Sequence, residues 1–310
     1  MRSIKDRGPT TAGAYPSLQH YSNKSIERDS MIVDCHTHVG EAEHLTKDFV
    51  KDAREASGNP QQQLAVNLDE HWEAMKTVDR AIVLGFRAHN VGYVVPNEYV
   101  ANYVHQHDEK LAGFASIDPH DDDAVEQLDY CVKDLGLKGL KLGPIYQNMH
   151  PSDPRFIRLF QRAEQLDIPI LIHQGTTFCH NVSLEYANPV LLQPIALAFP
   201  NLRMVIAHLG HPWIGETISL IRKHHNLYSD LSALYYRPWQ FYNAMVLARE
   251  YGVMHKLFLG SDYPVTTPQA SIDGLRNINA PAAGTAMPTI PAEDLEAIIH
   301  RDTFSILGLS

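Results

Sequence analysis

Short apolar runs rich in β-branched residues alternate along the chain with longer segments whose apolar positions recur at helical spacing. Strands that alternate with helices of about 10–15 residues indicate βαβ units and a parallel sheet. Eight such units over about 250 residues favour a single α/β domain, a closed (β/α)8 TIM barrel, over an open doubly wound sheet. The predicted strands are 31–38, 81–86, 111–118, 137–144, 168–175, 202–210, 226–234 and 256–264. The predicted helices are 97–110, 123–135, 153–166, 189–199, 213–224 and 239–251.

Two segments depart from this alternation. Residues 1–30 are polar and rich in turn formers, and they lack the apolar stretch of a secretory signal, so we expect a flexible tail. The barrel then occupies residues 31–310. Residues 41–66 follow the first strand directly and contain a helical stretch at 46–56 and a Gly-Asn-Pro break. An insertion at this point of a barrel is typical of a lid or a specificity element.

Composition and charge exclude several function classes. Acidic residues outnumber basic ones 36 to 26, and the net charge of −10 argues against binding to nucleic acid or to an anionic membrane. No apolar run reaches the roughly 18–20 residues of a membrane helix. No GxGxxG follows the first strand and no GxxxxGK[ST] occurs, which weakens the nucleotide-binding alternatives. The three cysteines, Cys35, Cys131 and Cys179, are widely spaced and predict free thiols in a reducing, cytoplasmic setting.

Histidines stand where three of the predicted strands end, and an aspartate stands where a fourth ends. The first strand ends in His36-Thr37-His38, and residues two apart on a strand project from the same face. His173, His208 and Asp262 end the fifth, sixth and eighth strands. Because the site of a barrel lies at the C-terminal ends of its strands, these five residues predict a metal centre at the barrel mouth.

Five motifs in this order resemble the amidohydrolase superfamily. They are DCHTH at 34–38, GLKGLKLGP at 136–144, IHQG at 172–175, AHLG at 207–210 and GSDYP at 260–264. The resemblance covers about residues 31–309. It is closest to the amidohydrolase-related branch, which includes aminocarboxymuconate-semialdehyde decarboxylase and related metal-dependent hydrolases.

The resemblance implies a set of metal ligands. His36, His38, His173 and Asp262 would hold one divalent ion, most simply zinc, with a water at an open position. Asp262 would also accept a proton, and His208 is assigned to catalysis ahead of metal ligation. Binuclear superfamily members carry a carboxylated lysine on strand four, where this chain has Lys138 and Lys141, so a second metal stays an open alternative.

Residues after the strands are candidates for substrate binding. They are Arg87, Tyr146, His180, His211 and Arg237. Because a guanidinium pairs bidentately with a carboxylate, Arg87 or Arg237 would suit a small acidic substrate. Salicylate-type decarboxylases of this branch have glutamates at the positions of His36 and His211, so this chain is less similar to them.

The leading hypothesis is a metal-dependent hydrolase that cleaves an ester, lactone or amide bond of a small, carboxylate-bearing molecule by metal-bound hydroxide. The alternative is non-oxidative decarboxylation of an aromatic or unsaturated carboxylic acid at the same metal. A third hypothesis, from another class, is a non-catalytic barrel that binds a metal or ligand. Barrels of this branch often form dimers, and a homodimer stays open.

Overall fold

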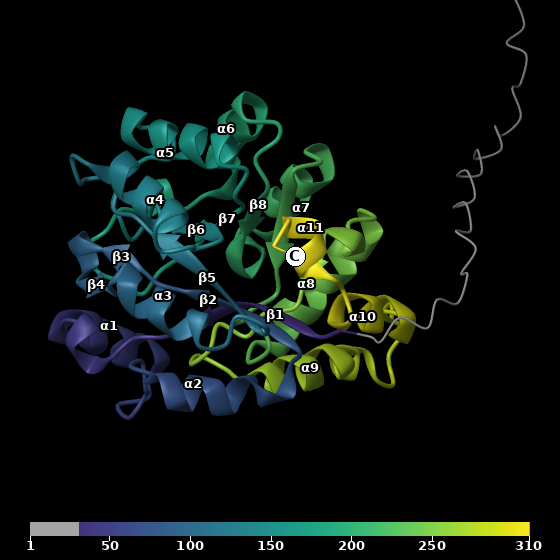
Figure 1. Cartoon of the computed structure of the whole chain (residues 1–310). Coiled ribbons are helices and arrows are strands. Elements are labelled where there is room, and N and C mark those ends of the chain that lie inside the picture. The colour runs from purple at the N-terminus through teal and green to yellow at the C-terminus, as the bar shows by residue number, and fades with distance from the viewer. Residues whose placement is uncertain (1–30, 310) are drawn as a thin grey trace, which may run out of the picture. The chain divides into compact units, whose positions relative to one another are not determined.

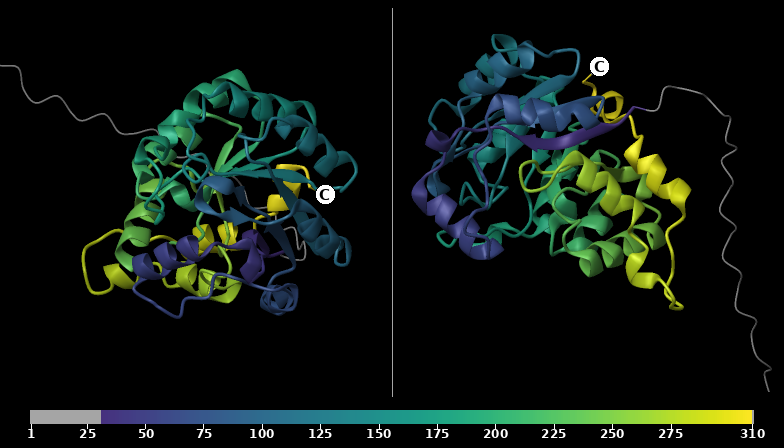
Figure 2. Two further views of the ribbon diagram at one scale, coloured as in Figure 1. Left: turned by 90° about the vertical axis from the view of Figure 1, so that its left-hand side faces the viewer. Right: turned by 90° about the horizontal axis from the view of Figure 1, so that it is seen from below.

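A ring of parallel strands forms the centre of the structure. The computed structural model describes residues 31–309. Its main sheet has eight strands in the order β1-β2-β5-β6-β7-β8-β9-β10. All seven neighbouring pairs in this order are parallel, and the helices lie outside the strands (Figures 1 and 2). The strands are β1 (Val33–His38), β2 (Arg80–Leu84), β5 (Leu111–Ser116), β6 (Gly139–Leu142), β7 (Ile170–Ile172), β8 (Met204–Ile206), β9 (Leu227–Asp230) and β10 (Leu257–Phe258).

Backbone hydrogen bonds join the first strand to the segment that follows the last one. The amide of Cys35 donates to the carbonyl of Leu259 at 3.0 Å, and the amide of His38 donates to the carbonyl of Tyr263 at 2.9 Å. The sheet is therefore nearly closed into the predicted TIM barrel. The register of β1 against β2 shifts between Asp34 and Thr37, and this irregularity includes His36.

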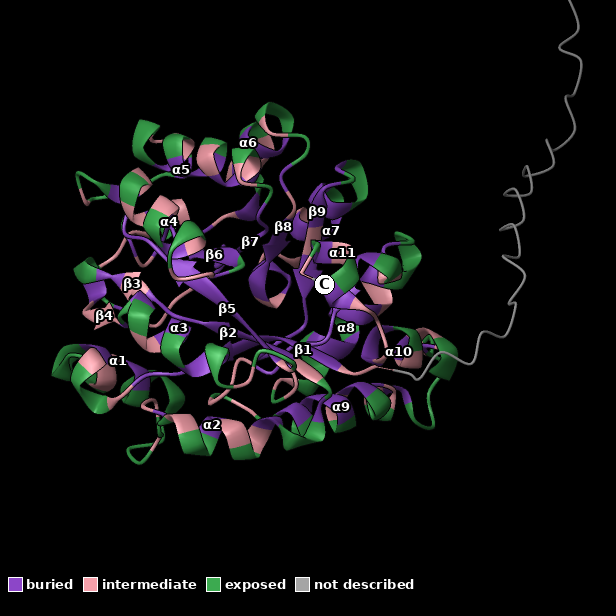
Figure 3. Cartoon of the chain, viewed as in Figure 1, coloured by how far each residue is buried: buried purple, intermediate pink, exposed green. Residues whose placement is uncertain are grey.

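The helices follow from their caps and apolar spacing. In α5, Asp153 accepts a hydrogen bond from the Arg155 amide, Pro154 starts the helix, and the buried residues fall three or four positions apart. In Figure 3 the helices carry exposed residues, drawn in green, on their outward sides, whereas the central strands are purple. The helices are α1 (Lys47–Ser57), α2 (Leu68–Ala74), α3 (Asn97–His105), α4 (Ala124–Lys133), α5 (Pro154–Gln165), α6 (Gln193–Ala198), α7 (Ile214–Lys223), α8 (Pro238–Glu250), α9 (Pro268–Arg276), α10 (Ala292–Ile299) and α11 (Thr303–Leu307).

The insertion after β1 packs against a small hairpin. Backbone bonds in both directions between Gly40 and Val66, at 3.0 and 2.8 Å, close the insertion, which carries α1. The hairpin consists of β3 (Arg87–Ala88) and β4 (Tyr93–Val94) and was not predicted. The Thr46 amide donates to the Gly92 carbonyl at 2.9 Å, so insertion and hairpin meet beside the barrel mouth.

The residues 1–30 predicted to form a tail lie outside the described part of the chain. Within the described part, no helix is long and apolar enough to cross a membrane. The three cysteines predicted to be free thiols are unpaired and buried.

Candidate metal centre

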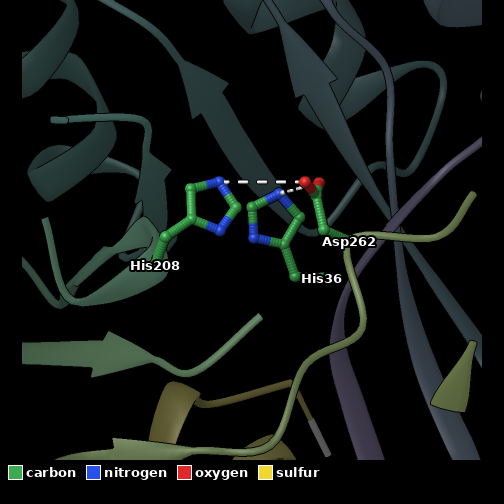
Figure 4. Close-up of side chains that lie close together, drawn as sticks. All are labelled: His36, His208 and Asp262. Carbon is green, nitrogen blue, oxygen red and sulfur yellow. Dashed lines mark ion pairs between the residues drawn. The ribbon is translucent and has the colours of Figure 1, made fainter. Parts of the chain in front are cut away.

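Three residues from three strand ends bring their donor atoms together. The ligand atoms of His36, His208 and Asp262 all lie within 4.8 Å of one another (Figure 4). His36 Nε2 is 3.3 Å from Asp262 Oδ1, and His208 Nε2 is 4.0 Å from Asp262 Oδ2. His38 joins them, because its Nε2 lies 3.2 Å from His36 Nε2 and 3.4 Å from Asp262 Oδ1.

Strand ends and unusual backbone conformations position these side chains. The amide of Asp262 donates to the carbonyl of His36 at 2.7 Å, which fixes the two segments against each other. Asp262 and His208 have left-handed φ values of 58° and 56°, as does Leu209 at 48°. Such conformations cost about 1–3 kcal/mol each and persist where the surroundings impose them, which is common at functional sites.

A buried carboxylate that the sequence analysis missed orients two of these histidines. Asp230 Oδ2 accepts a hydrogen bond from His36 Nδ1 at 2.9 Å, and Asp230 Oδ1 accepts one from the His208 amide at 2.9 Å. Because Nδ1 of His36 carries the proton, the lone pair of Nε2 faces the centre. His208 Nδ1 donates to the Ser232 carbonyl at 3.1 Å, which likewise turns the lone pair of Nε2 inward. Asp230 ends β9, so the end-of-strand signal used for the other residues also marks it.

Burial or neighbouring charges lower the pKa values of His36, His38 and Asp262. Burial, and then the charge of Lys141, lowers the pKa of His36 to about 3, and burial also lowers the pKa of His38. Burial acts to raise the pKa of Asp262, but His208, His36 and His38 outweigh it and hold that pKa below its ordinary value. At neutral pH, the rings of His36 and His38 are thus uncharged and Asp262 carries a negative charge.

The donor set fits a divalent cation. The Nε2 atoms of His36 and His38 lie 3.2 Å apart beside a carboxylate oxygen of Asp262, and a cation among these atoms would be stabilised by all three. Nδ1 of His38 is buried without a hydrogen-bond partner, so nothing in the structure ties that ring elsewhere. Imidazole and carboxylate ligands suit zinc and also manganese, iron or cobalt.

Lys141 and His173 lie beside the converging residues, but each has another role or another partner. Lys141 is buried on β6 with its Nζ 3.2 Å from His36 Nε2, and burial lowers its pKa to about 8. His173 Nε2 donates to the Thr176 carbonyl at 2.9 Å, and its ring contacts the edge of His208. The ligand role of His173 stays a prediction, because this nitrogen is bound to the backbone. Lys138 is exposed.

The predicted substrate residues divide into two groups. Tyr146 lines a pocket of about 110 Å³ over the centre, whereas Arg87, His180, His211 and Arg237 do not line it. Arg87 contacts Asp121 at 3.4 Å, and His180 pairs with Asp52 of α1 at 3.0 Å. The roles assigned to these residues stay predictions.

His211 and Arg237 are close enough to interact with each other. Burial, and then the charges of Arg237 and His208, lowers the pKa of His211 to about 4. Arg237 itself is directed at the ring of Tyr236, with 4.3 Å between its Cζ and the ring centroid.

A family model described as Amidohydrolase matches residues 33–301. The chain belongs to the amidohydrolase family. Two curated relatives match parts of this amidohydrolase. A dihydroorotase of Helicobacter pylori is 31% identical over 116 residues, which cover 35% of this chain and 32% of the relative. A 2-amino-3-carboxymuconate-6-semialdehyde decarboxylase of Dictyostelium discoideum is 24% identical over 154 residues, which cover 44% and 43%. The chain thus spans about a third of the length of the first relative and less than half of the second.

Solved structures share the fold of this amidohydrolase over nearly its whole described length. A TIM-barrel protein of Bordetella bronchiseptica has a TM-score of 0.68 at 20% identity, covering 90% of this chain and 98% of its own. A probable 2-pyrone-4,6-dicarboxylic acid hydrolase of Acinetobacter baumannii has a TM-score of 0.63 at 17% identity, with 89% and 99% covered. A 2,6-dihydroxybenzoate decarboxylase from Rhizobium has a TM-score of 0.63 at 15% identity, with 90% and 99% covered.

Proposed function

We propose that this amidohydrolase is a metal-dependent hydrolase that cleaves an ester, lactone or amide bond of a small molecule. The observation that carries the proposal is the convergence of His36, His208 and Asp262 within 4.8 Å at the inner end of a pocket. Zinc is the cation we propose. Manganese is the main competitor, since a structurally similar dihydroxybenzoic acid decarboxylase of Polaromonas has it bound.

The residues of the chain would handle the proton. A divalent cation at this centre would polarise a substrate carbonyl and lower the pKa of a water. Asp262 is ionised at neutral pH and would accept one proton of that water at a carboxylate oxygen as the water oxygen bonds to the carbonyl carbon. The same proton would then pass to the departing oxygen or nitrogen as its bond to carbon breaks. His208 Nε2, 4.0 Å from Asp262 Oδ2, is placed to share this proton.

Decarboxylation of an aromatic or unsaturated acid is the second candidate. The aromatic side chains that line the pocket favour it, because they would stack on a planar acid. The same centre would serve it, since Asp262 could take a proton from water or from the substrate and pass it to the carbon that loses carbon dioxide. The two reactions therefore differ in product rather than in the residues required.

Turnover by metal-loaded protein separates these candidates. The chain would be stripped with a chelator, reloaded with zinc or manganese, and offered esters, lactones, amides and unsaturated carboxylic acids. We expect hydrolysis in the first three classes and a loss of more than about 100-fold in kcat/KM for Asp262→Asn and His208→Gln. The matched variants Asp108→Asn and His225→Gln, at exposed positions, should retain activity.

The products decide between the hypotheses. Carbon dioxide release without hydrolysis would favour the decarboxylase. A fully metallated protein that turns over none of these compounds would overturn both and revive the non-catalytic barrel.

A further inference from the structure

Five aromatic side chains form a closed circuit of ring contacts at the barrel mouth. Their centroids are separated by 5.1 Å (Phe49–Tyr93), 5.4 Å (Tyr93–Phe86), 5.3 Å (Phe86–Tyr146), 6.4 Å (Tyr146–Phe178) and 5.2 Å (Phe178–Phe49). We call these five residues the aromatic collar. They come from five separate segments: α1 of the insertion, the ends of β2 and β6, the hairpin and the loop after β7.

The collar encloses a space of limited size. All five side chains line the pocket of about 110 Å³ that ends at His36 and Asp262, together with the aliphatic side chains of Leu45 and Leu64. A cavity of about 150 Å³ lined by such groups holds one benzene molecule. At about 110 Å³ the pocket is smaller than that cavity, so it has room for at most one ring, which would stack against aromatic faces and edges.

Charge is confined to the inner end of this pocket. The charged side chains among the described residues that line it are Lys141 and Asp262. Lys141 already interacts favourably with Asp262 and Asp230, which act to raise its pKa, and its Nζ contacts His36. Arginine does not occur among these lining residues. The collar and the aliphatic walls thus offer no cation to a second charged group of a substrate.

We infer that the pocket selects a flat, single-ring substrate whose substituents away from the reacting bond carry no charge. The inference rests on the proposed hydrolase function and narrows it. It differs from the carboxylate-bearing substrate expected from the sequence, because Arg87 and Arg237 do not line the pocket. A six-membered unsaturated lactone fits this description. In its hydrolysis the water oxygen bonds to the carbonyl carbon, the bond from that carbon to the ring oxygen breaks, and the ring oxygen takes a proton. Burying an unpaired carboxylate against the collar would cost several kcal/mol, so a charged ring is disfavoured.

Two lactones of nearly the same shape test this inference. In 6-methyl-2-pyrone the substituent is neutral, and in 2-pyrone-6-carboxylate it is an anion. We expect the metal-loaded protein to open the methyl compound with a kcat/KM at least about tenfold higher. The ratio of the two kcat/KM values is the readout, because unproductive binding lowers kcat and KM together and leaves kcat/KM unchanged.

A substitution in the wall should reverse the preference. Leu64 lines the pocket and is partly exposed, so Leu64→Arg would bring a cation to the wall without burying it fully. This variant should shift the ratio at least about tenfold towards the carboxylate. The matched control is Leu197→Arg on α6, where the leucine is 62% exposed and does not line the pocket. It should leave the ratio unchanged.

The outcomes distinguish this inference from the proposed function. Faster opening of the carboxylate by the unmodified protein, or an unchanged ratio in Leu64→Arg, overturns the inference while leaving the hydrolase proposal intact. Absence of turnover with both pyrones and with every ester, lactone and amide overturns both.

Discussion

Asp230 Oδ2 accepts a hydrogen bond from His36 Nδ1 at 2.9 Å, and the Asp230 carboxyl group is fully buried. Burial acts to raise the pKa of Asp230, but His36, His208 and Ser232 outweigh it and hold the pKa below its ordinary value. The carboxylate therefore stays charged and would make His36 a more basic ligand in the proposed metal centre. Carboxylate–imidazole–metal chains of this kind set both the orientation and the strength of a metal ligand.

Asp230→Asn should weaken metal binding without removing a ligand. An amide keeps an oxygen that can accept from His36 but loses the negative charge, so we expect affinity to fall about 10–100-fold. Competition against a chromophoric chelator measures the affinity, and the exposed substitution Asp108→Asn serves as the control. Equal affinities in the two variants would contradict this role for Asp230.

Substitutions of single residues at the centre should separate metal binding from catalysis. His36→Ala and Asp262→Ala should lose the metal, because each deletes one of the ligands predicted from the sequence, whose donor atoms lie 3.3 Å apart. His208→Ala should keep the metal and lose turnover. Elemental analysis per chain measures the first property. Full metal retention in Asp262→Ala would refute the proposed centre, and metal loss in His208→Ala would make that residue a ligand.

The free energy of unfolding should decrease at acidic pH, because His71 takes up a proton when the chain unfolds. This fully buried histidine contacts Tyr103 Oη and Thr37 Oγ1, both at 2.9 Å, and burial, followed by His38, lowers its pKa to about 3. Between that value and the unfolded pKa of about 6.5, only the unfolded state holds the proton. The free energy of unfolding therefore decreases as pH falls through this window, by about 2 kcal/mol between pH 7 and pH 5.

His71→Gln should remove this contribution. Urea unfolding at pH 7 and pH 5 measures it, and the difference between the two pH values should be about 2 kcal/mol smaller in the variant. Equal differences in variant and unmodified chain would show that His71 does not titrate on unfolding.

Gly92→Ala should disturb the contact between hairpin and insertion. Gly92 has a φ of 74°, and a Cβ there would collide with the side chain of Thr46. Gly58 has a similar φ of 65° with nothing near its Cβ position, so Gly58→Ala reports the cost of the backbone conformation alone. We expect Gly92→Ala to lower the free energy of unfolding by about 1–3 kcal/mol more than Gly58→Ala. Gly92→Ala should also reduce kcat/KM, because the next residue, Tyr93, lines the pocket. Thermal and urea unfolding measure both variants. Equal losses of unfolding free energy in Gly92→Ala and Gly58→Ala would show that the contact between Gly92 and Thr46 does not contribute to stability.

Local patterns in the sequence predicted the barrel, because each buried strand and each amphipathic helix leaves its own periodicity. The predicted helix at 153–166 corresponds to Pro154–Gln165, and the helical stretch of the insertion at 46–56 corresponds to Lys47–Ser57. The hairpin escaped prediction because each of its strands has two residues, too few to show an alternation.

The chemistry at strand ends was also readable, but the direction of side chains in loops was not. The convergence of His36, His38 and Asp262 follows from parallel strands ending at one edge of the barrel. Arg87 contacts Asp121 rather than the pocket, and this pairing joins two loops whose approach no local pattern announces. The collar has the same origin, since its five rings meet only after the loops have packed.

The seam between the first strand and the end of the last one has a consequence for biosynthesis. The Asp34 carboxylate accepts from the Ser261 amide at 2.9 Å across 227 positions of sequence, and Asp262 meets His36 directly beside this bond. While the chain emerges from the ribosome, the histidine pair is present long before its acidic counterpart has been translated. The proposed metal centre would therefore be complete only after the segment that follows β10 has been synthesised, because a shorter chain would lack Asp262.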